Sequence, residues 1–199
     1  GGQAVYEKRP NSGIMCNGVT LARHCLMTGD YERELPDIMS PGGKGYYGKF
    51  RTDQYHHDLG MSVGEAIISP TRLFGPVVKD ILDSLPSGTV HGMVHNTGGG
   101  QTKCLRIGKD VRYVKDGLPE PDPIFWLVQQ ESGEKWQDMY RGFNMGIGLE
   151  FFVPEEYAGR ILEIAGKYGV GAQRTGYVSE GVGRPTLWIG PKFGSFNYP

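Results

Sequence analysis

The sequence predicts an α/β (α+β-like) fold in which helices pack on a mixed sheet built from two split βαβ units. Strand, helix and strand follow one another twice along the chain, and an insertion with helices of its own separates the two occurrences. The chain has 199 residues, which is enough to bury a core without disulfide bonds. The length alone allows one large domain or two small ones.

The first predicted helix spans Asn17–Met27. Asn17 can cap it, and apolar side chains recur at helical spacing along it. The stretch Thr28–Tyr55 that follows is rich in Gly, Pro and Tyr and shows no periodicity of either kind. It predicts an irregular loop, spanning about residues 28–57 of the domain. Loops of this length inside a compact domain are usually functional or mobile.

The first strand–helix–strand unit comes next. The apolar run Val63–Ile68 predicts one strand, and Val90–His95 predicts another. Between them Thr71 opens an amphipathic helix, whose apolar residues share one face as far as Leu85. A proline and a glycine just beyond Leu85 end this helix.

The insertion and the second unit follow by the same criteria. The insertion holds a short strand and two short helices. The second unit has a strong strand and a helix that begins with proline and two glutamates, as suits a helix N-terminus. The elements in order are the strand Val111–Val114, the helices Pro123–Glu131 and Lys135–Arg141, the strand Ile147–Val153, the helix from Pro154, and the strands Ala172–Val178 and Thr186–Ile189.

Charge and cysteine content exclude several classes of protein. The 21 basic and 22 acidic residues give a net charge of −1 without a run of either sign, so neither nucleic acid nor a membrane is an expected partner. No stretch approaches the ~18 apolar residues of a membrane helix. Cys16, Cys25 and Cys104 are widely spaced, which indicates free thiols in the cytoplasm. Residues 1–11 read like the middle of a polypeptide, so we expect a preceding segment.

Glycine accounts for 32 of the 199 residues and gathers at particular loops. The clearest cluster is His95–Gly100 (HNTGGG), at the end of a predicted strand. Consecutive glycines let the backbone approach a ligand and turn its N–H groups toward an anion, so phosphate is the natural candidate. The motif has neither Walker nor dinucleotide spacing. A turn needed only for packing explains it equally well.

Two further segments have weaker signals. In Phe143–Gly148 (FNMGIG), Asn144 is the side chain that could recognise a polar ligand, although packing explains the glycines more simply. In Ser12–Gly18 (SGIMCNG), a helix N-terminus with an Asn cap offers donors to phosphate or carboxylate, although plain capping is favoured about two to one.

Other groupings do not predict a site. Neighbouring residues in His56-His57-Asp58 point to different sides, so we expect no metal there. The three cysteines lack the surroundings of a nucleophile. No sequence pattern pairs any two of the acids Asp37, Glu65 and Glu150, and no Ser–His–Asp pattern emerges. The sequence therefore identifies no catalytic residue.

Five blocks in the same order resemble the C-terminal domain of aminoimidazole ribonucleotide (AIR) synthetases, the phosphoribosylformylglycinamidine cyclo-ligases. SGIMCNG with VTLAR resembles the family's SG-x-H-SNG-x-SLVR, and LGMSVGEAIISPTRLF resembles GEALLxPTRIY. HGMVHNTGGG resembles HITGGG, FNMGIGLEF resembles FNxGxGM, and AQRTGYV resembles IGxV. The blocks run from Ser12 to Val178, which is most of the chain. The resemblance implies that residues 1–199 form one such C-terminal domain.

The resemblance implies an ATP-dependent ring closure in purine biosynthesis. Formylglycinamidine ribonucleotide would be activated at its formyl oxygen by phosphoryl transfer, and an amidine nitrogen would close the imidazole. ATP and Mg²⁺ would be held mainly by an N-terminal domain that this chain does not contain, and the parent enzyme would be a homodimer. The residues implied are Asn17, Thr97, Gly98, Gly99 and Gly100 for the nucleotide, and His95, Asn144 and Gly146 for the substrate.

The sequence also departs from the family pattern. Met15 stands where the family commonly has histidine, and Cys16 replaces the serine, so an acid–base role of that histidine is absent here. Two alternatives stay open. The chain could belong to another ATP-using member of the superfamily, such as a formylglycinamidine synthase, selenophosphate synthetase or thiamine-phosphate kinase. It could also be a non-catalytic module that binds a phosphorylated metabolite.

Overall fold

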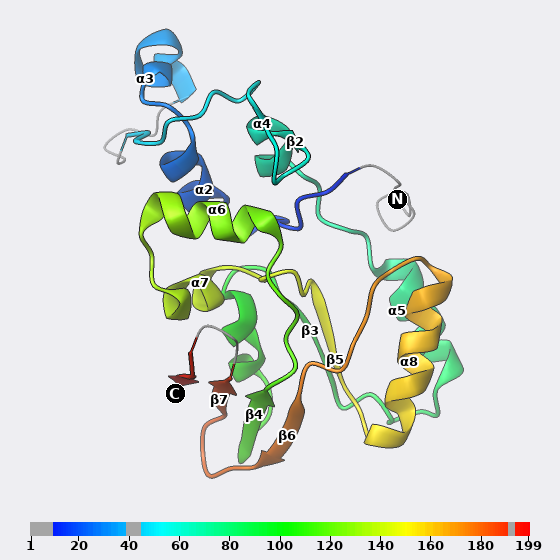
Figure 1. Ribbon diagram of the computed structural model, residues 1–199. Coiled ribbons are helices and arrows are strands. Elements are labelled where there is room, and N and C mark those ends of the chain that lie inside the picture. Colours follow the sequence, from blue (N-terminus) through cyan, green and yellow to red (C-terminus); the bar gives the residue numbers. More distant parts are fainter. Residues whose placement is uncertain (1–9, 39–44, 191–193) are drawn as a thin grey trace.

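The computed structural model describes residues 10–38, 45–190 and 194–199. One end of the molecule is mainly helical but also holds β2, most of the other strands lie toward the other end, and α5 and α8 lie side by side next to β3 and β5 (Figure 1). Helices and a mixed sheet are both present, which confirms the predicted α/β class. Among the described residues, no helix has the length and apolar content needed to cross a bilayer.

The larger sheet has four strands in the order β6-β4-β7-β8. Its central pair, β4 (Val111–Lys115) and β7 (Thr186–Ile189), is parallel. The outer strands β6 (Tyr177–Glu180) and β8 (Phe196–Tyr198) pair antiparallel with them. Parallel and antiparallel neighbours therefore occur in one sheet, as predicted.

The smaller sheet pairs β3 (Gly92–His95) with β5 (Leu149–Phe152), so that His95 lies opposite Leu149. Two amphipathic helices, α5 (Gly75–Ser84) and α8 (Glu155–Lys167), pack beside it. They share a small core of their own, made by Val77, Ile81, Leu85, Ile161 and Ile164.

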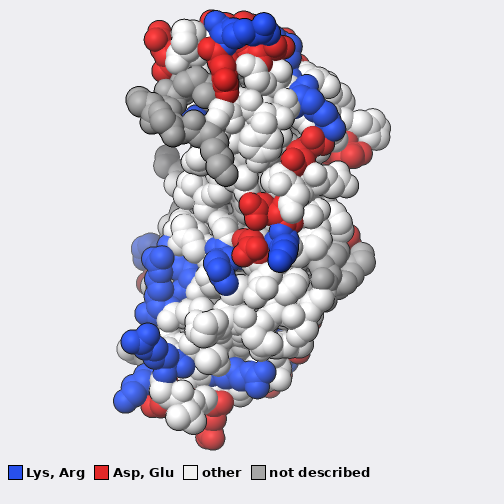
Figure 2. Space-filling view, turned by 90° about the vertical axis from the view of Figure 1, so that its left-hand side faces the viewer, with Lys and Arg blue, Asp and Glu red and all other residues white. Residues whose placement is uncertain are grey.

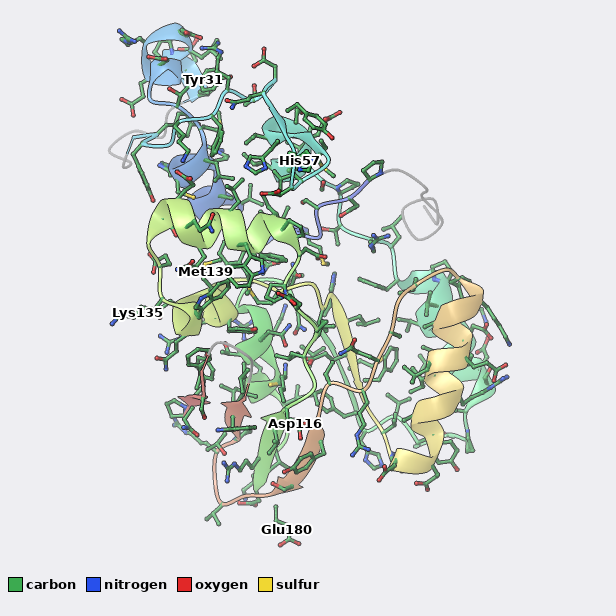
Figure 3. All side chains as sticks on the ribbon, viewed as in Figure 1. Tyr31, His57, Asp116, Lys135, Met139 and Glu180 are labelled. Atoms are coloured by element: carbon green, nitrogen blue, oxygen red, sulfur yellow. The ribbon has the colours of Figure 1, made fainter. Side chains whose placement is uncertain are left out.

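The main core lies where the helices meet the larger sheet. Helix α2 (Val19–Leu26) packs against α6 (Pro123–Ser132), and α7 (Trp136–Gly142) packs against the 3₁₀ helix η2 (Gly100–Arg106). Met139 lies inside this helical part, whereas Lys135 and Glu180 project from the surface (Figure 3). Its largest fully buried side chains are Tyr140, Phe125, Phe143, Ile14 and Leu26.

The predicted strand Val63–Ile68 is wrong. After the two-residue strand β2 (Met61–Ser62), which pairs with β1 (Tyr55–His56), the chain forms the helix α4 (Val63–Ile67). Ser62 and Glu65 form a reciprocal capping box that starts this helix. Its buried residues recur at i, i+3 and i+4, so a short apolar run satisfied a strand pattern and a helix pattern alike.

The prediction that Asn17 caps the first helix is also wrong. Gly18 occupies the N-cap position with φ of 75°, and the Asn17 amide donates instead to the Gly142 carbonyl at 3.0 Å. The strand predicted at Ala172–Val178 forms only from Tyr177, because the preceding segment packs against the end of β4, where Gly117 N donates to Thr175 O.

The irregular loop at 28–57 is partly regular. It contains α3 (Asp30–Glu34), the 3₁₀ turn η1 (Pro36–Ile38) and β1, and bridges join Met27 to Phe50 and Thr28 to Gly48. Residues 39–44 of this stretch lie outside the described residues. Acidic and basic side chains intermix at the α3 end (Figure 2), where Arg33 pairs with Asp30 and Arg51 with Glu34.

The other predicted elements are confirmed, with shifts at their ends. The helix expected from Thr71 starts at Gly75, and the strands expected at Val90 and Ile147 start two residues later. The strand Thr186–Ile189 has the predicted bounds. The second strand–helix–strand order therefore exists along the chain as β5–α8–β6, although β5 and β6 belong to different sheets and do not form a βαβ unit. In the first unit, α4 stands where the first strand was expected.

Candidate ligand-binding cleft

The Asn144 side chain joins two of the three glycine-containing motifs. Asn144 is fully buried, and its Nδ2 donates to the carbonyls of Gly13 and Ile14 at 3.1 and 3.0 Å and to Asn17 Oδ1 at 3.2 Å. Its Oδ1 accepts from Gly146 N at 2.7 Å. The segments 12–18 and 143–148 are therefore fixed against each other, 130 positions apart in sequence.

The glycine loop joins the same assembly. Gln101, just after the loop, donates through Nε2 to the Asn144 carbonyl. Asn96 N donates to Gly148 O, and Asn96 Nδ2 to Ile147 O, both at 2.9 Å. The structure therefore brings together all three segments that the sequence marked as candidate sites.

The side-chain amides of Asn17 and Asn144 already form hydrogen bonds with other protein groups. Asn17 is 4% exposed and Asn144 is not exposed at all, and buried amides that already have partners position the backbone around them. Within the loop, Gly98 is exposed with open space around it, whereas Gly100 is buried. The surroundings are cationic: Lys103 Nζ donates to Thr97 Oγ1, and Arg106 Nη2 is 3.6 Å from where a Cβ on Gly99 would lie.

His95 begins the loop. Its ring packs edge-on against Phe74 with centroids 5.6 Å apart, and its buried Nε2 has no partner among the described residues. Burial, with a smaller contribution from the Lys103 ammonium, lowers the pKa of His95. The stability linked to this shift is present above the ordinary histidine pKa and is lost as the pH falls through the lowered folded value.

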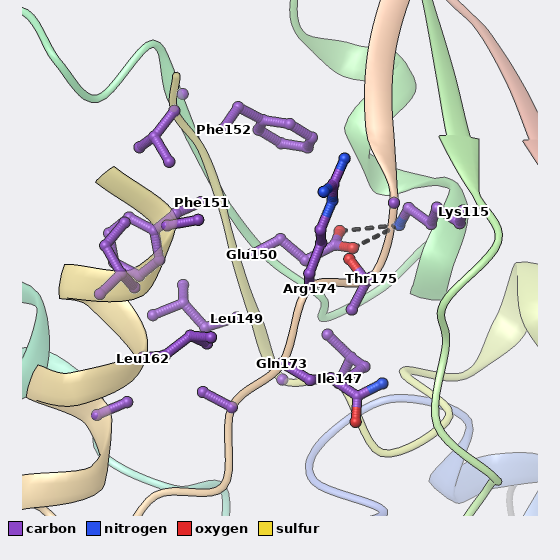
Figure 4. A pocket seen from close by; sticks show the side chains of 18 of the residues that line it. Lys115, Ile147, Leu149, Glu150, Phe151, Phe152, Leu162, Gln173, Arg174 and Thr175 are labelled. Atoms are coloured by element: carbon purple, nitrogen blue, oxygen red, sulfur yellow. Dashed lines mark hydrogen bonds and ion pairs between the residues drawn. The ribbon is translucent and has the colours of Figure 1, made fainter. Parts of the chain in front are cut away.

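A cleft of about 940 Å³ opens beside these segments (Figure 4). Its walls come from β5 and α8 on one side and from β4 and residues 169–178 on the other. Gly13, Met15 and Gly146 line its end nearest the three motifs. Of the predicted site residues only Gly146 lines the cleft. The others, His95, Asn17, Asn144 and Thr97–Gly100, are not among its lining residues.

Asp122 and Arg72 line the same end of the cleft, and the sequence did not single them out. The Asp122 carboxylate is half-buried beside two glycines: a Cβ on Gly13 would be 2.1 Å, and one on Gly146 3.2 Å, from Asp122 Oδ2. It makes no hydrogen bond to the described part of the chain. Its position between two prolines was the signal available in the sequence.

The surroundings of Asp122 disfavour the charged form of its carboxyl group. Burial raises the pKa of the Asp122 carboxyl, and the Arg72 guanidinium opposes the rise. A raised folded pKa means that the fold is stabilised below the ordinary pKa and loses this stability as the pH rises through the folded value. Carboxyl groups whose pKa is shifted in this way occur at functional sites more often than on ordinary surfaces.

A second polar feature of the wall is the ion pair between Lys115 of β4 and Glu150 of β5, at 2.8 Å. No pattern in the sequence predicted a partner for Glu150. Met15, at the position of the family histidine, adopts φ of 59° and is buried on the wall, with its sulfur against Gly148. Cys16 is exposed, and Cys25 and Cys104 are buried free thiols.

A metal site is not formed by the residues that the structure describes, since no three His, Cys, Asp or Glu side chains gather there. His57 and Asp58, which the sequence suggested only weakly, are exposed, and their closest atoms, Nδ1 and Oδ1, are 3.6 Å apart.

Comparison with known proteins identifies relatives across most of the chain. The family described as "AIR synthase related protein, C-terminal domain" matches residues 5–186. A phosphoribosylformylglycinamidine cyclo-ligase from Methanopyrus kandleri is 35% identical over 183 residues, or 92% of this chain and 45% of that protein. Relatives of the same name from Methanococcus vannielii and Methanocaldococcus jannaschii are 33% and 35% identical, covering 86% and 84% of this chain and 43% and 42% of their own length. The chain thus spans less than half the length of these relatives.

Proposed function

The chain belongs to the AIR synthase related protein family, as a C-terminal domain, and we propose that it forms one wall of the active site of an ATP-dependent cyclo-ligase of purine biosynthesis. The reaction converts formylglycinamidine ribonucleotide to aminoimidazole ribonucleotide. The formyl oxygen accepts the phosphoryl group of ATP, an amidine nitrogen attacks the activated carbon, and phosphate leaves. ADP and phosphate are the other products.

The single observation that supports this proposal is the meeting of three motif segments, two of which line one end of the cleft. Asn144 and Gln101 hold these segments together through buried hydrogen bonds. Preorganised backbone donors of this kind stabilise charge that develops during phosphoryl and acyl transfer. The cationic side chains of Lys103 and Arg106 beside the glycines suit an anionic ligand.

Each predicted residue then has a role in the proposal. In the loop Thr97–Gly100, Gly98 and Gly99 present their backbone N–H groups to a phosphate, because the N–H groups of Thr97 and Gly100 already donate to the carbonyls of His95 and Thr97. His95 lies at the base of that loop near the substrate. Gly146 leaves room for substrate beside the Asp122 carboxylate. Asn17 and Asn144 position the loops, because their amides are already bonded within the protein.

The glycine loop fits an ATP phosphate, whereas the described residues do not fit Mg²⁺, since they provide no cluster of metal ligands. Bound ATP supplies the phosphoryl group that activates the substrate. In this proposal the metal and most ATP contacts belong to the part of the relatives that this chain does not span. The proposal also includes that the complete enzyme is a homodimer in the cytoplasm. The free thiols of Cys16, Cys25 and Cys104 support the cytoplasmic location.

The proposal is tested with the complete polypeptide that carries this chain. We expect ADP release from ATP to depend on formylglycinamidine ribonucleotide, with the imidazole product formed in equal amount. The matched control is the nucleotide with an amide in place of the amidine, because its amide nitrogen is too weakly nucleophilic to close the ring. Absence of turnover with the amidine would refute the cyclo-ligase assignment.

Met15 supports a second candidate, in which the enzyme is another ATP-using member of the superfamily with a different substrate. The thioether cannot transfer a proton, so chemistry that needs the family histidine would be lost. Turnover of the amide substrate in the presence of ammonia, without turnover of the amidine, would select this alternative.

A further inference from the structure

Lys115 and Glu150 form a buried ion pair that has no role in the proposed reaction steps. Their side chains are 4% and 5% exposed. Lys115 extends from β4 and Glu150 from β5, so the pair crosses between the two sheets (Figure 4). The dashed lines in Figure 4 join these two side chains across the cleft.

The Lys115 ammonium also bonds the residue after the glycine loop. Its Nζ donates to Glu150 Oε2 at 2.8 Å and to the carbonyl and Oε1 of Gln101 at 2.9 and 2.8 Å. These partners use all three donors of an ammonium group. Gln101 is itself fully buried, so both polar ends of its side chain have protein partners.

Gln101 extends this network to the three motifs. Its Nε2 donates to the carbonyl of Asn144, whose side chain holds Gly13, Ile14 and Asn17. A continuous series of hydrogen bonds therefore runs from the cleft wall to every segment of the candidate site. Because every member has partners, such a network fixes one arrangement of the loops it joins.

Stability alone does not account for a buried pair at this place. Removing two charges from water is costly, and apolar residues of similar volume often stabilise a fold as well or better. The pair also adjoins buried Cys104, whose pKa burial raises to about 11 while Lys115 lowers it and Glu150 raises it. The directional bonds to Gln101 are what apolar residues could not replace.

We propose that Lys115 and Glu150 are positioning residues that hold the glycine loop, through Gln101, in the orientation that binds the phosphorylated ligand. The identity of that ligand rests on the proposed function. The orientation of the loop does not, because it follows from the contacts of Lys115 and Gln101.

The test uses a double variant, Lys115→Met/Glu150→Leu, in the complete enzyme. Each single variant leaves a buried charge without its partner. The double variant leaves no unpaired charge, although the carbonyl and Oε1 of Gln101 still lack the Lys115 donor, and it is expected to regain part of the melting temperature lost by Lys115→Met. We expect the double variant to keep a KM for the phosphorylated substrate about tenfold above wild type, with kcat changed less than twofold. The exposed pair Arg160–Glu163, at 2.7 Å, provides the control as Arg160→Met/Glu163→Leu.

Amide hydrogen exchange of Gly98–Gln101 gives a readout that needs no turnover. Exchange there should be about tenfold faster in the double variant than in the control variant. A double variant with wild-type KM would overturn the proposal, whatever its exchange rates. If wild type itself shows no turnover, the proposed function fails, and wild-type exchange rates in the double variant would then overturn the positioning role.

Discussion

Asn144→Ala is expected to destabilise the fold by about 3–5 kcal/mol. The change removes a fully buried amide that donates to three groups and accepts from Gly146 N. It leaves the carbonyls of Gly13 and Ile14 without this donor in a water-poor site, and each unsatisfied buried group costs roughly 1–3 kcal/mol. Urea unfolding followed by tryptophan fluorescence measures the loss.

Asn96→Ala is the matched control for this variant. Asn96 is equally buried, but its side chain makes one hydrogen bond, to Ile147 O, and its Oδ1 has no partner among the described residues. We expect a loss of about 1–2 kcal/mol. Equal losses for the two variants would show that Asn144 does not join the segments as described.

Gly100→Ala is expected to lower the free energy of unfolding by about 3 kcal/mol or more, because an alanine side chain suits neither the backbone conformation nor the space at this position. Gly100 has φ of 48°, which disfavours a side chain, and a Cβ there would lie 2.3 Å from Phe143 O. Phe143 is packed against Phe125 in the core and has no room to withdraw. Thermal and urea unfolding of the variant measure the cost.

Gly98→Ala, two residues away, should behave differently. A Cβ at Gly98 meets no atom within 4 Å, so stability should change by less than about 1 kcal/mol. Affinity for the phosphorylated substrate should nevertheless fall, because the methyl group occupies the exposed face of the loop. A loss of stability at Gly98 as large as that at Gly100 would contradict this division between a ligand-facing glycine and a packing glycine.

The elements with clear periodicity were predictable from the sequence. The helices around Phe125 and Tyr140 and the strand Thr186–Ile189 formed where their patterns indicated. The structure of the run Val63–Ile67 could not be predicted, because five residues rich in apolar side chains fit either a strand or a single helical turn. The capping pair of Ser62 and Glu65 was the local signal that would have decided it.

The candidate site was predictable as three separate motifs but not as one assembly. Asn144 was noted as a polar side chain, yet its contacts lie about 130 positions away, beyond any local pattern. Lys115 and Glu150 are 35 positions apart on different sheets. Asp122 and Arg72 gained their importance only from the fold, which places them together at the end of the cleft.

Hydrogen exchange of the complete enzyme with and without formylglycinamidine ribonucleotide tests the location of the site most directly. Binding is expected to increase protection in segments 12–18, 95–101 and 143–148 together, because one hydrogen-bond network joins them. A second cleft, lined in part by Lys49, His56 and Trp126, should show no change. Protection confined to that second cleft, with the three segments unchanged, would contradict the proposed site.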